Sequence, residues 1–189
     1  MASALWLIRH GETAWSLSGQ HTSLTDLPLT PEGERKAAAV GKMLAGKKFA
    51  AVFVSPMLRA RETCRLAGYA ESATVTGDLR EWNYGSYEGL TTAQIQESAP
   101  GWSIWTAPPA GGETIAQVAE RARRAIQSAP EGDVAIFAHG HILRVLTACW
   151  LQIEPEMGRC FALSTGSISI LGYERETPVI QMWNQTSLG

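Results

Sequence analysis

The chain has 189 residues, a length that suits one hydrophobic core, and we expect residues 1–189 to form a single domain. Its 45% hydrophobic and 18% charged residues exclude disordered and fibrous proteins. Sixteen basic side chains against eighteen acidic ones give a net charge of −2, without the basic surplus that neutralising a nucleic acid backbone requires, so we expect no nucleic acid partner.

The three cysteines, Cys64, Cys149 and Cys160, never show CxxC spacing, so the sequence indicates neither a disulfide framework nor a zinc knuckle. Arg9 and His10 interrupt the N-terminal apolar run, and no apolar stretch reaches the ~18 residues of a membrane helix. We therefore expect a cytoplasmic protein without a membrane partner. The low charge and the seven tryptophans favour a subunit contact, as in a homodimer.

Short apolar runs rich in Val, Ile and Phe alternate with segments of helical period. This order predicts an α/β protein of three layers, with helices on both faces of a mostly parallel central sheet. Strands are expected at residues 4–9, 50–54, 133–138, 160–164, 168–173 and 178–183. Helices are expected from Thr30 to about Gly46 and at residues 57–68, 114–129 and 141–151, with a loop over 100–112.

In the segment 114–129, apolar residues recur at helical spacing and define a buried face. Arg121, Arg123 and Arg124 fall outside that face, so we interpret all three as solvated helix positions. We assign them no functional role.

Histidine and arginine side chains gather where the expected strands end. Arg9 and His10 follow the first strand, Arg59 comes shortly after the second, and His139 follows the third. In open α/β sheets, ligands bind beyond the carboxyl ends of the strands, so these residues are candidates for one site. Two guanidinium groups and two imidazoles would form a positive pocket that suits a dianionic phosphate.

A metal centre is the rival interpretation of a histidine cluster, because neutral imidazole is the commonest metal ligand. Neighbouring arginines would repel a cation, and Asp26, Asp78 and Asp133 are too dispersed for a two-metal phosphatase. We therefore predict no metal and no other cofactor. The sequence also lacks the GxSxG, HExxH and GxxxxGK[ST] motifs and a Cys followed six residues later by Arg, which leaves covalent catalysis by a histidine.

Six sequence blocks carry a family resemblance. They are RHGET at 9–13, DLPLTPEG at 26–33, SPMLRARET at 55–63, LREWNYGSYEG at 79–89, GGET at 111–114 and AHG at 138–140. In this order they resemble the motifs of the histidine phosphatase superfamily, which includes the cofactor-dependent phosphoglycerate mutases. The resemblance covers most of the chain and implies a phosphoglycerate mutase-like fold.

The resemblance also implies roles for matching side chains. His10 would be the nucleophile that becomes phosphohistidine, and Glu81 would be the proton donor. The clamp for the phosphoryl group would consist of Arg9, Arg59 and His139. These roles require a neutral His10, with one ring nitrogen held by a backbone carbonyl, and a protonated His139. Glu81 would have to protonate the leaving alkoxide and then activate water.

Each of these residues, taken alone, also has an ordinary structural interpretation. His10 or His139 at a strand end could be a hydrogen-bonded histidine of the core. Arg59 could pair with Glu62, and Glu81 could be a surface carboxylate. The family order of the blocks favours the phosphotransfer site.

Two departures from the mutase pattern bear on the substrate. The mutases carry an asparagine and an arginine where this chain has Ser16 and Gln20. A neutral Gln20 lacks the bidentate pairing that an arginine offers to a carboxylate, which argues against a phosphoglycerate substrate.

The stretch WSLSGQHTSLTD at 15–26 is instead similar to a segment of the fungal sedoheptulose-1,7-bisphosphatase branch, and so is HGH at 139–141 followed by Arg144. Arg144 would meet a second phosphate or a sugar hydroxyl, or else it is an exposed helix arginine. The substrate contacts that this resemblance implies are Ser16, Gln20, Thr22, Ser23, Gly140 and Arg144.

The chain lacks the long insertions that shield the phosphohistidine of the mutases, since only 30 residues separate Glu81 from Gly111 and a short polar tail, 184–189, follows the last strand. A water-accessible phosphoenzyme hydrolyses, so we predict a metal-independent phosphomonoesterase that acts on sugar phosphates or bisphosphates. A mutase or phosphoprotein phosphatase is the alternative enzyme, and a phospho-ligand binding protein is the alternative without turnover. Trp102 and Trp105 either roof the pocket or pack at the surface.

Overall fold

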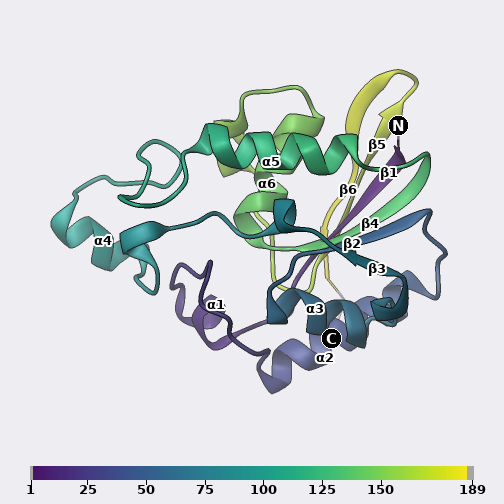
Figure 1. Ribbon diagram of the computed structural model, residues 1–189, viewed down its shortest axis with the longest axis horizontal. Helices are drawn as coiled ribbons and strands as arrows, with labels where there is room; N and C mark the ends of the chain where they lie inside the picture. Colours follow the sequence, from purple (N-terminus) through teal and green to yellow (C-terminus); the bar gives the residue numbers. More distant parts are fainter. Residues whose placement is uncertain (1, 187–189) are drawn as a thin grey trace.

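A computed structural model describes residues 2–186 and contains one sheet of six strands in the order β3-β2-β4-β1-β5-β6 (Figure 1). Parallel pairs join β1 to β4, β4 to β2 and β2 to β3, whereas β5 pairs antiparallel with β1 and β6. The predicted mostly parallel sheet is confirmed. The strands are β1 (Ala2–Arg9), β2 (Ala51–Val54), β3 (Ala73–Val75), β4 (Gly132–Ala138), β5 (Ile168–Glu174) and β6 (Thr177–Gln185).

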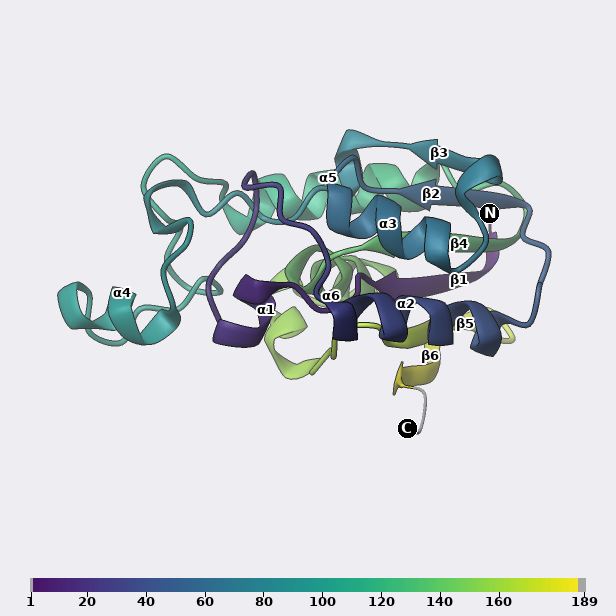
Figure 2. The same cartoon turned by 90° about the horizontal axis from the view of Figure 1, so that it is seen from below.

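Helices cover both faces of the sheet, which confirms the three predicted layers (Figures 1 and 2). α5 and α6 pack on one face and α2 and α3 on the other, while α1 and α4 lie beyond the carboxyl ends of the parallel strands. The α-helices are α1 (Ala14–Ser18), α2 (Pro31–Leu44), α3 (Leu58–Leu66), α4 (Thr92–Ser98), α5 (Ile115–Gln127) and α6 (Gly140–Trp150). The 3-10 helices are η1 (Ala70–Ser72), η2 (Gly77–Leu79), η3 (Gly85–Tyr87) and η4 (Pro155–Cys160).

The central strand β4 supplies both halves of the core, because successive side chains of a strand point to opposite faces. Val134 and Ile136 belong to the apolar cluster under α5 and α6. Ala135 and Phe137 belong to the cluster under α2 and α3. Burial on both faces explains why the strand appears as a continuous apolar run in the sequence.

The expected strand at 160–164 is wrong. Its main-chain groups pair with side chains instead of a neighbouring strand: the carbonyl oxygen of Ala162 accepts from Trp183 Nε1, and the N–H of Ser164 donates to Asn184 Oδ1 at 2.7 Å. The segment therefore crosses the end of the sheet as irregular chain. The expected loop over 100–112 contains no helix or strand, as predicted.

The sequence analysis missed three short elements, α1, α4 and β3. None of the residues of α1 is buried, and Ile95 is the one buried residue of α4, so neither helix shows an apolar period. Two of the three residues of β3 are exposed. Residues 184 and 185 of the expected polar tail belong to β6, and residues 187–189 lie outside the described residues.

On α5, the solvated interpretation is confirmed for Arg123 and Arg124 and is wrong for Arg121. The Arg121 side chain is only 13% exposed. It lies against the segment that follows β3 and donates to the carbonyl oxygens of Asp78 and Arg80. Among residues 2–186, no helix has both the length and the apolarity needed to cross a bilayer.

The N-terminal turn of α2 lies directly against the chain that leaves β1. A Cβ atom on Gly11 would be 2.3 Å from the carbonyl oxygen of Gly33, and a Cβ atom on Gly33 would be 2.1 Å from the carbonyl oxygen of Glu12. The side chain and main chain of Thr30, the N-cap of α2, also contact Glu12. Backbone meets backbone at this point, so only glycine fits at both positions.

We expect Gly33→Ala to lower the free energy of unfolding by about 1–3 kcal/mol, because an added methyl group in a tightly packed position displaces backbone. Urea unfolding measures this loss. The matched control is Glu34→Ala at an exposed position of the same turn, which should change stability by less than about 1 kcal/mol. Equal effects of the two variants would contradict the packing analysis.

Candidate active site

Parallel pairing brings three strand ends to one edge of the sheet. Arg9 lies opposite Ala138 in the β1–β4 register, and the main-chain N–H of His10 donates to the carbonyl oxygen of Ala138 at 3.0 Å. The N–H of Ser55, just after β2, donates to the carbonyl oxygen of Phe137 at 3.0 Å. His10, Ser55 and the residue after Ala138 are therefore neighbours, although they lie far apart in the sequence.

His10 is held as a neutral imidazole. Its Nδ1 lies 2.6 Å from the carbonyl oxygen of Gly11, so Nδ1–H donates and Nε2 keeps its lone pair. Burial, and then the charges of Arg59 and Arg9, hold the pKa of His10 well below its usual value of 6.5. The predicted backbone carbonyl contact is confirmed, and the lowered pKa favours the predicted neutral ring. Such a ring is a nucleophile through Nε2.

His139 lies edge-on to His10, with 5.1 Å between the ring centroids. Its Nδ1 accepts from Arg59 Nε at 3.1 Å, and its Nε2 lies 2.7 Å from Ser55 Oγ. The ring is therefore neutral with its proton on Nε2. Burial first, and the charge of Arg59 second, hold the pKa of His139 well below 6.5. The expectation of a protonated His139 is wrong for this arrangement.

The two predicted clamp arginines have different surroundings. Arg59 is completely buried, and besides His139 it donates to the carbonyl oxygens of Thr22, Ser23 and Thr25 at 3.2 Å each. It holds the chain segment 22–25 in place from behind the cavity.

Arg9 lines the cavity itself. Its Nη1 donates to the carbonyl oxygen of Leu163, whereas its buried Nε has no hydrogen-bond partner among residues 2–186. Gly140 lies against the same guanidinium, because a Cβ atom there would be 3.4 Å from its Cζ and Nε. An unpaired donor of a buried cation at the cavity wall is suited to an anionic ligand.

Glu81 also lines the cavity and is only 6% exposed. Its carboxylate accepts three main-chain N–H groups, those of Trp82 at 2.9 Å, His141 at 3.0 Å and Ile142 at 2.9 Å. The side chain of His139, the N-cap residue of α6, does not cap the helix. Glu81 therefore supplies the cap from another part of the chain, which ties the carboxyl group to the first turn of α6.

These groups surround a cavity of about 170 Å³. Of the predicted substrate contacts, five line it and Ser23 does not, because Ser23 faces a separate cavity behind Glu81. Arg59 and His139 lie behind the lining residues. The predicted site residues that line the cavity are Arg9, His10, Ser16, Gln20, Thr22, Glu81, Gly140 and Arg144.

The lining side chains of Ser16 and Gln20 have hydrogen-bond partners within the protein. The Ser16 hydroxyl belongs to the capping box of α1 with Thr13. The Gln20 amide donates to the carbonyl oxygen of Gly89 at 2.7 Å. Both side chains shape the wall of the cavity in this way, and their contact with substrate stays a prediction.

A family model described as the histidine phosphatase superfamily (branch 1) matches residues 5–186. The chain belongs to this superfamily. An acid phosphatase of Mycobacterium tuberculosis is 44% identical over 176 residues, which cover 90% of this chain and 86% of the relative. A sedoheptulose 1,7-bisphosphatase of Saccharomyces cerevisiae is 39% identical over 181 residues, 78% of this chain and 67% of the relative.

The solved structure of an open reading frame of Mycobacterium tuberculosis has a TM-score of 0.91 to this chain, with 41% identity and coverage of 97% of both chains. The superfamily and these relatives support the predicted enzyme class, a phosphatase. The expected resemblance of the six motif blocks is thereby confirmed.

Six residues that were not predicted as site residues also line the cavity, and three of them carry rings, namely His21, Tyr84 and His141. The Tyr84 hydroxyl lies 2.7 Å from His141 Nδ1. Burial, followed by the charge of Arg144, holds the pKa of His141 well below 6.5. A possible signal was the position of Tyr84, three residues after Glu81 in the same motif block.

The Trp102–Trp105 segment neither covers the first cavity nor packs at the surface. Trp102 and Trp105 are buried and line a second cavity of about 270 Å³, which shares His21 and His141 with the first. The two imidazoles therefore lie between the cavity of His10 and an aromatic cavity.

Because His10 and His139 stay neutral in the folded protein, the unfolded chain binds more protons than the folded chain below pH 6.5. Stability should therefore be fully present above that pH and fall as the pH is lowered. Each histidine should cost about 1 kcal/mol between pH 6.5 and about pH 5.5.

Urea unfolding across this range measures the effect. His139→Gln should remove its own contribution and reduce the pH dependence, with those of His10 and His141 remaining, since an amide does not titrate. A free energy of unfolding that stays constant in the wild type from pH 7 to pH 5.5 would contradict the assignment of neutral histidines.

Proposed function

We propose that this protein is a phosphomonoesterase that hydrolyses small phosphorylated metabolites through a phosphohistidine on His10. The observation that supports this most directly is the His10 ring, with Nδ1 tied to Gly11 and its Nε2 lone pair at a cavity that also holds Arg9 and Glu81. A buried, neutral imidazole beside a guanidinium and a carboxyl group is suited to phosphoryl transfer.

In the first half of the reaction, the Nε2 lone pair of His10 attacks phosphorus and the ester P–O bond breaks. The leaving oxygen takes a proton from the Glu81 carboxyl group. In the second half, the Glu81 carboxylate takes a proton from a water molecule that attacks phosphorus. The P–N bond breaks, and inorganic phosphate and free His10 result.

Positively charged residues around the cavity stabilise the negative charge of the transferred phosphoryl group. Arg9 Nε offers an unpaired N–H. For Arg59 and His139 the proposed role is still the clamp, with the Nε2–H of His139 turning from Ser55 Oγ to a phosphoryl oxygen. A neutral N–H donor serves this purpose without a second proton on the ring.

We expect His10→Ala to lower turnover of p-nitrophenyl phosphate at least about 1,000-fold, because the nucleophile is lost. Vanadate should still bind through the arginines. Rapid quench of the wild type with ³²P-labelled ester should leave an acid-labile label on the protein. Wild-type turnover in the variant, or a wild type without the label, would refute the mechanism.

The substrate class is proposed from Arg144. Its Nε and Nη2 donate to the carbonyl oxygens of Gly158 at 3.0 Å and Arg159 at 2.9 Å, and its guanidinium lies 4.6 Å from the ring centroid of Trp105. These contacts fix the guanidinium, and Arg144 lines the cavity of His10. A fixed second cation favours sugar bisphosphates, the substrate class named for the yeast relative.

Arg144→Met should raise KM for a sugar bisphosphate about tenfold, and KM for the matching monophosphate less than about threefold, since only the bisphosphate loses a charged contact. Steady-state assays with both esters measure the difference. Arg123→Met, at an exposed site of α5, is the control. An equal rise in both KM values would remove the bisphosphate preference and leave the hydrolase proposal intact.

A further inference from the structure

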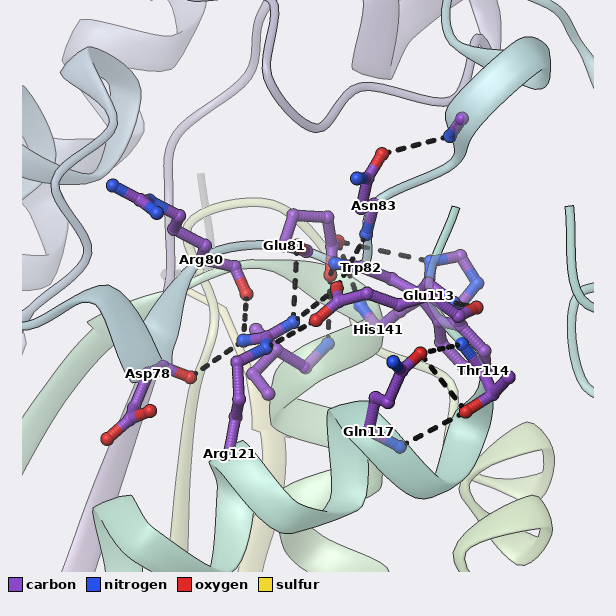
Figure 3. Close-up of polar contacts among 12 residues, drawn as sticks. Asp78, Arg80, Glu81, Trp82, Asn83, Glu113, Thr114, Gln117, Arg121 and His141 are labelled. Carbon is purple, nitrogen blue, oxygen red and sulfur yellow. Dashed lines mark hydrogen bonds and ion pairs between the residues drawn. The ribbon is translucent and has the colours of Figure 1, made fainter. Parts of the chain in front are cut away.

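The chain segment that carries Glu81 has no regular hydrogen-bond ladder. Residues 80–84 belong to no helix or strand. Buried main-chain groups almost always find a partner, so the partners of this segment decide how firmly it is held. Two side chains contact this main chain on either side of Glu81. They are Arg121 of α5 and Glu113, which lies just before α5 (Figure 3).

Arg121 contacts the main chain on the N-terminal side of Glu81. Figure 3 shows the side chain reaching from α5 to three carbonyl groups. Nη1 donates to the carbonyl oxygens of Asp78 at 2.8 Å and Arg80 at 2.9 Å, and Nη2 lies 3.5 Å from that of Glu81. One guanidinium therefore fixes the direction in which the chain enters Glu81.

Glu113 contacts the chain on the other side. Its carboxylate forms a bidentate pair with Arg121, 2.8 Å to both Nε and Nη2, and also accepts the N–H of Asn83 at 2.9 Å. Its own N–H donates to the carbonyl oxygen of Asn83 at 3.0 Å, and its carbonyl oxygen accepts Trp82 Nε1 at 2.8 Å. The ion pair thus holds the main chain both before and after Glu81.

The space around the ion pair of Glu113 and Arg121 determines what its loss would do to Glu81. A cavity of about 170 Å³ adjoins it and is lined by Glu81, Glu113 and Arg121 together. Shorter side chains would extend this cavity to the main chain of Glu81. The carboxyl group of Glu81, seated on the N–H groups of α6, would then be attached to a segment free to shift.

We propose that Glu113 and Arg121 are positioning residues for Glu81, and that their ion pair keeps the carboxyl group within proton-transfer reach of the leaving oxygen. This inference rests on the proposed role of Glu81 as the proton donor. Proton transfer requires hydrogen-bond distance, and a displacement of about 1 Å can lower a rate by two orders of magnitude. Neither residue touches the cavity of His10.

The test compares two esters whose leaving groups differ in their need for a proton. An alkyl phosphate needs a proton on its leaving oxygen, whereas p-nitrophenolate leaves without one. In a two-step mechanism, kcat/KM reports only the steps up to departure of the leaving group. Arg121→Lys keeps the positive charge and loses the planar fork. It should lower kcat/KM about tenfold for an alkyl phosphate and less than about threefold for p-nitrophenyl phosphate.

Arg124→Lys is the matched control. Arg124 lies on the same helix and pairs with the half-buried carboxylate of Asp78 and the exposed one of Glu120, not with the main chain around Glu81. It should leave the ratio of the two kcat/KM values unchanged. Vanadate inhibition should also stay within about twofold in both variants, because Arg9 and His10, which would hold the anion, are not contacted by Arg121 or Arg124.

Glu113→Gln provides a second, independent variant. It should change the kcat/KM ratio in the same direction as Arg121→Lys, and the double variant should lose less than the product of the two single losses, as expected for residues that act as one unit. Urea unfolding of each variant shows that the folded protein is being compared.

Equal losses for the two esters, or an unchanged ratio in folded Arg121→Lys, would overturn the positioning role. The wild type would in that case still form the labelled phosphoenzyme, so the proposed function would survive. A wild type that forms no phosphoenzyme refutes the proposed function, and this inference with it.

Discussion

The parallel register of β1 and β4 is the constraint on which the site depends. With Arg9 opposite Ala138, the residue after each strand is a histidine, and one ring lies edge-on to the other. A slip of one residue would turn every side chain of β1 to the opposite face. Such a slip would move Ile8 out of the apolar cluster under α2 and α3.

Burial then decides the chemistry of the histidines. Near guanidinium groups, a desolvated imidazole stays neutral, which suits a nucleophile that must present a lone pair. The same conditions act on His139, which therefore donates a neutral N–H. The positive charge of the site resides on arginines, whose charge does not depend on pH in the physiological range.

Much of this arrangement could be predicted from the sequence. The strand ends and the motif blocks identified Arg9, His10 and Glu81, because parallel strands deliver their last residues to one edge. The sequence could not show that Arg59 and His139 lie one layer deeper, since that depends on how the segment 22–25 folds over the guanidinium.

Arg121 shows that the helical spacing of apolar residues does not predict which polar residues are exposed. Helical spacing correctly places it outside the apolar face of α5, but a polar face is not always a solvated one. The irregular segment around Glu81 lies over that face and uses the guanidinium for its own main-chain groups. The strand expected at 160–164 failed for a similar reason, because side chains from elsewhere satisfy its backbone.

The irregular segment after η4 has one more consequence. Leu163 forms part of the cavity wall and receives Arg9 through its carbonyl oxygen, while its neighbours Ala162 and Ser164 are held by Trp183 and Asn184 of β6. The outer hairpin of β5 and β6 thus supports one side of the cavity wall. Substitutions in that hairpin can therefore change the shape of the cavity without changing any residue of the six motif blocks.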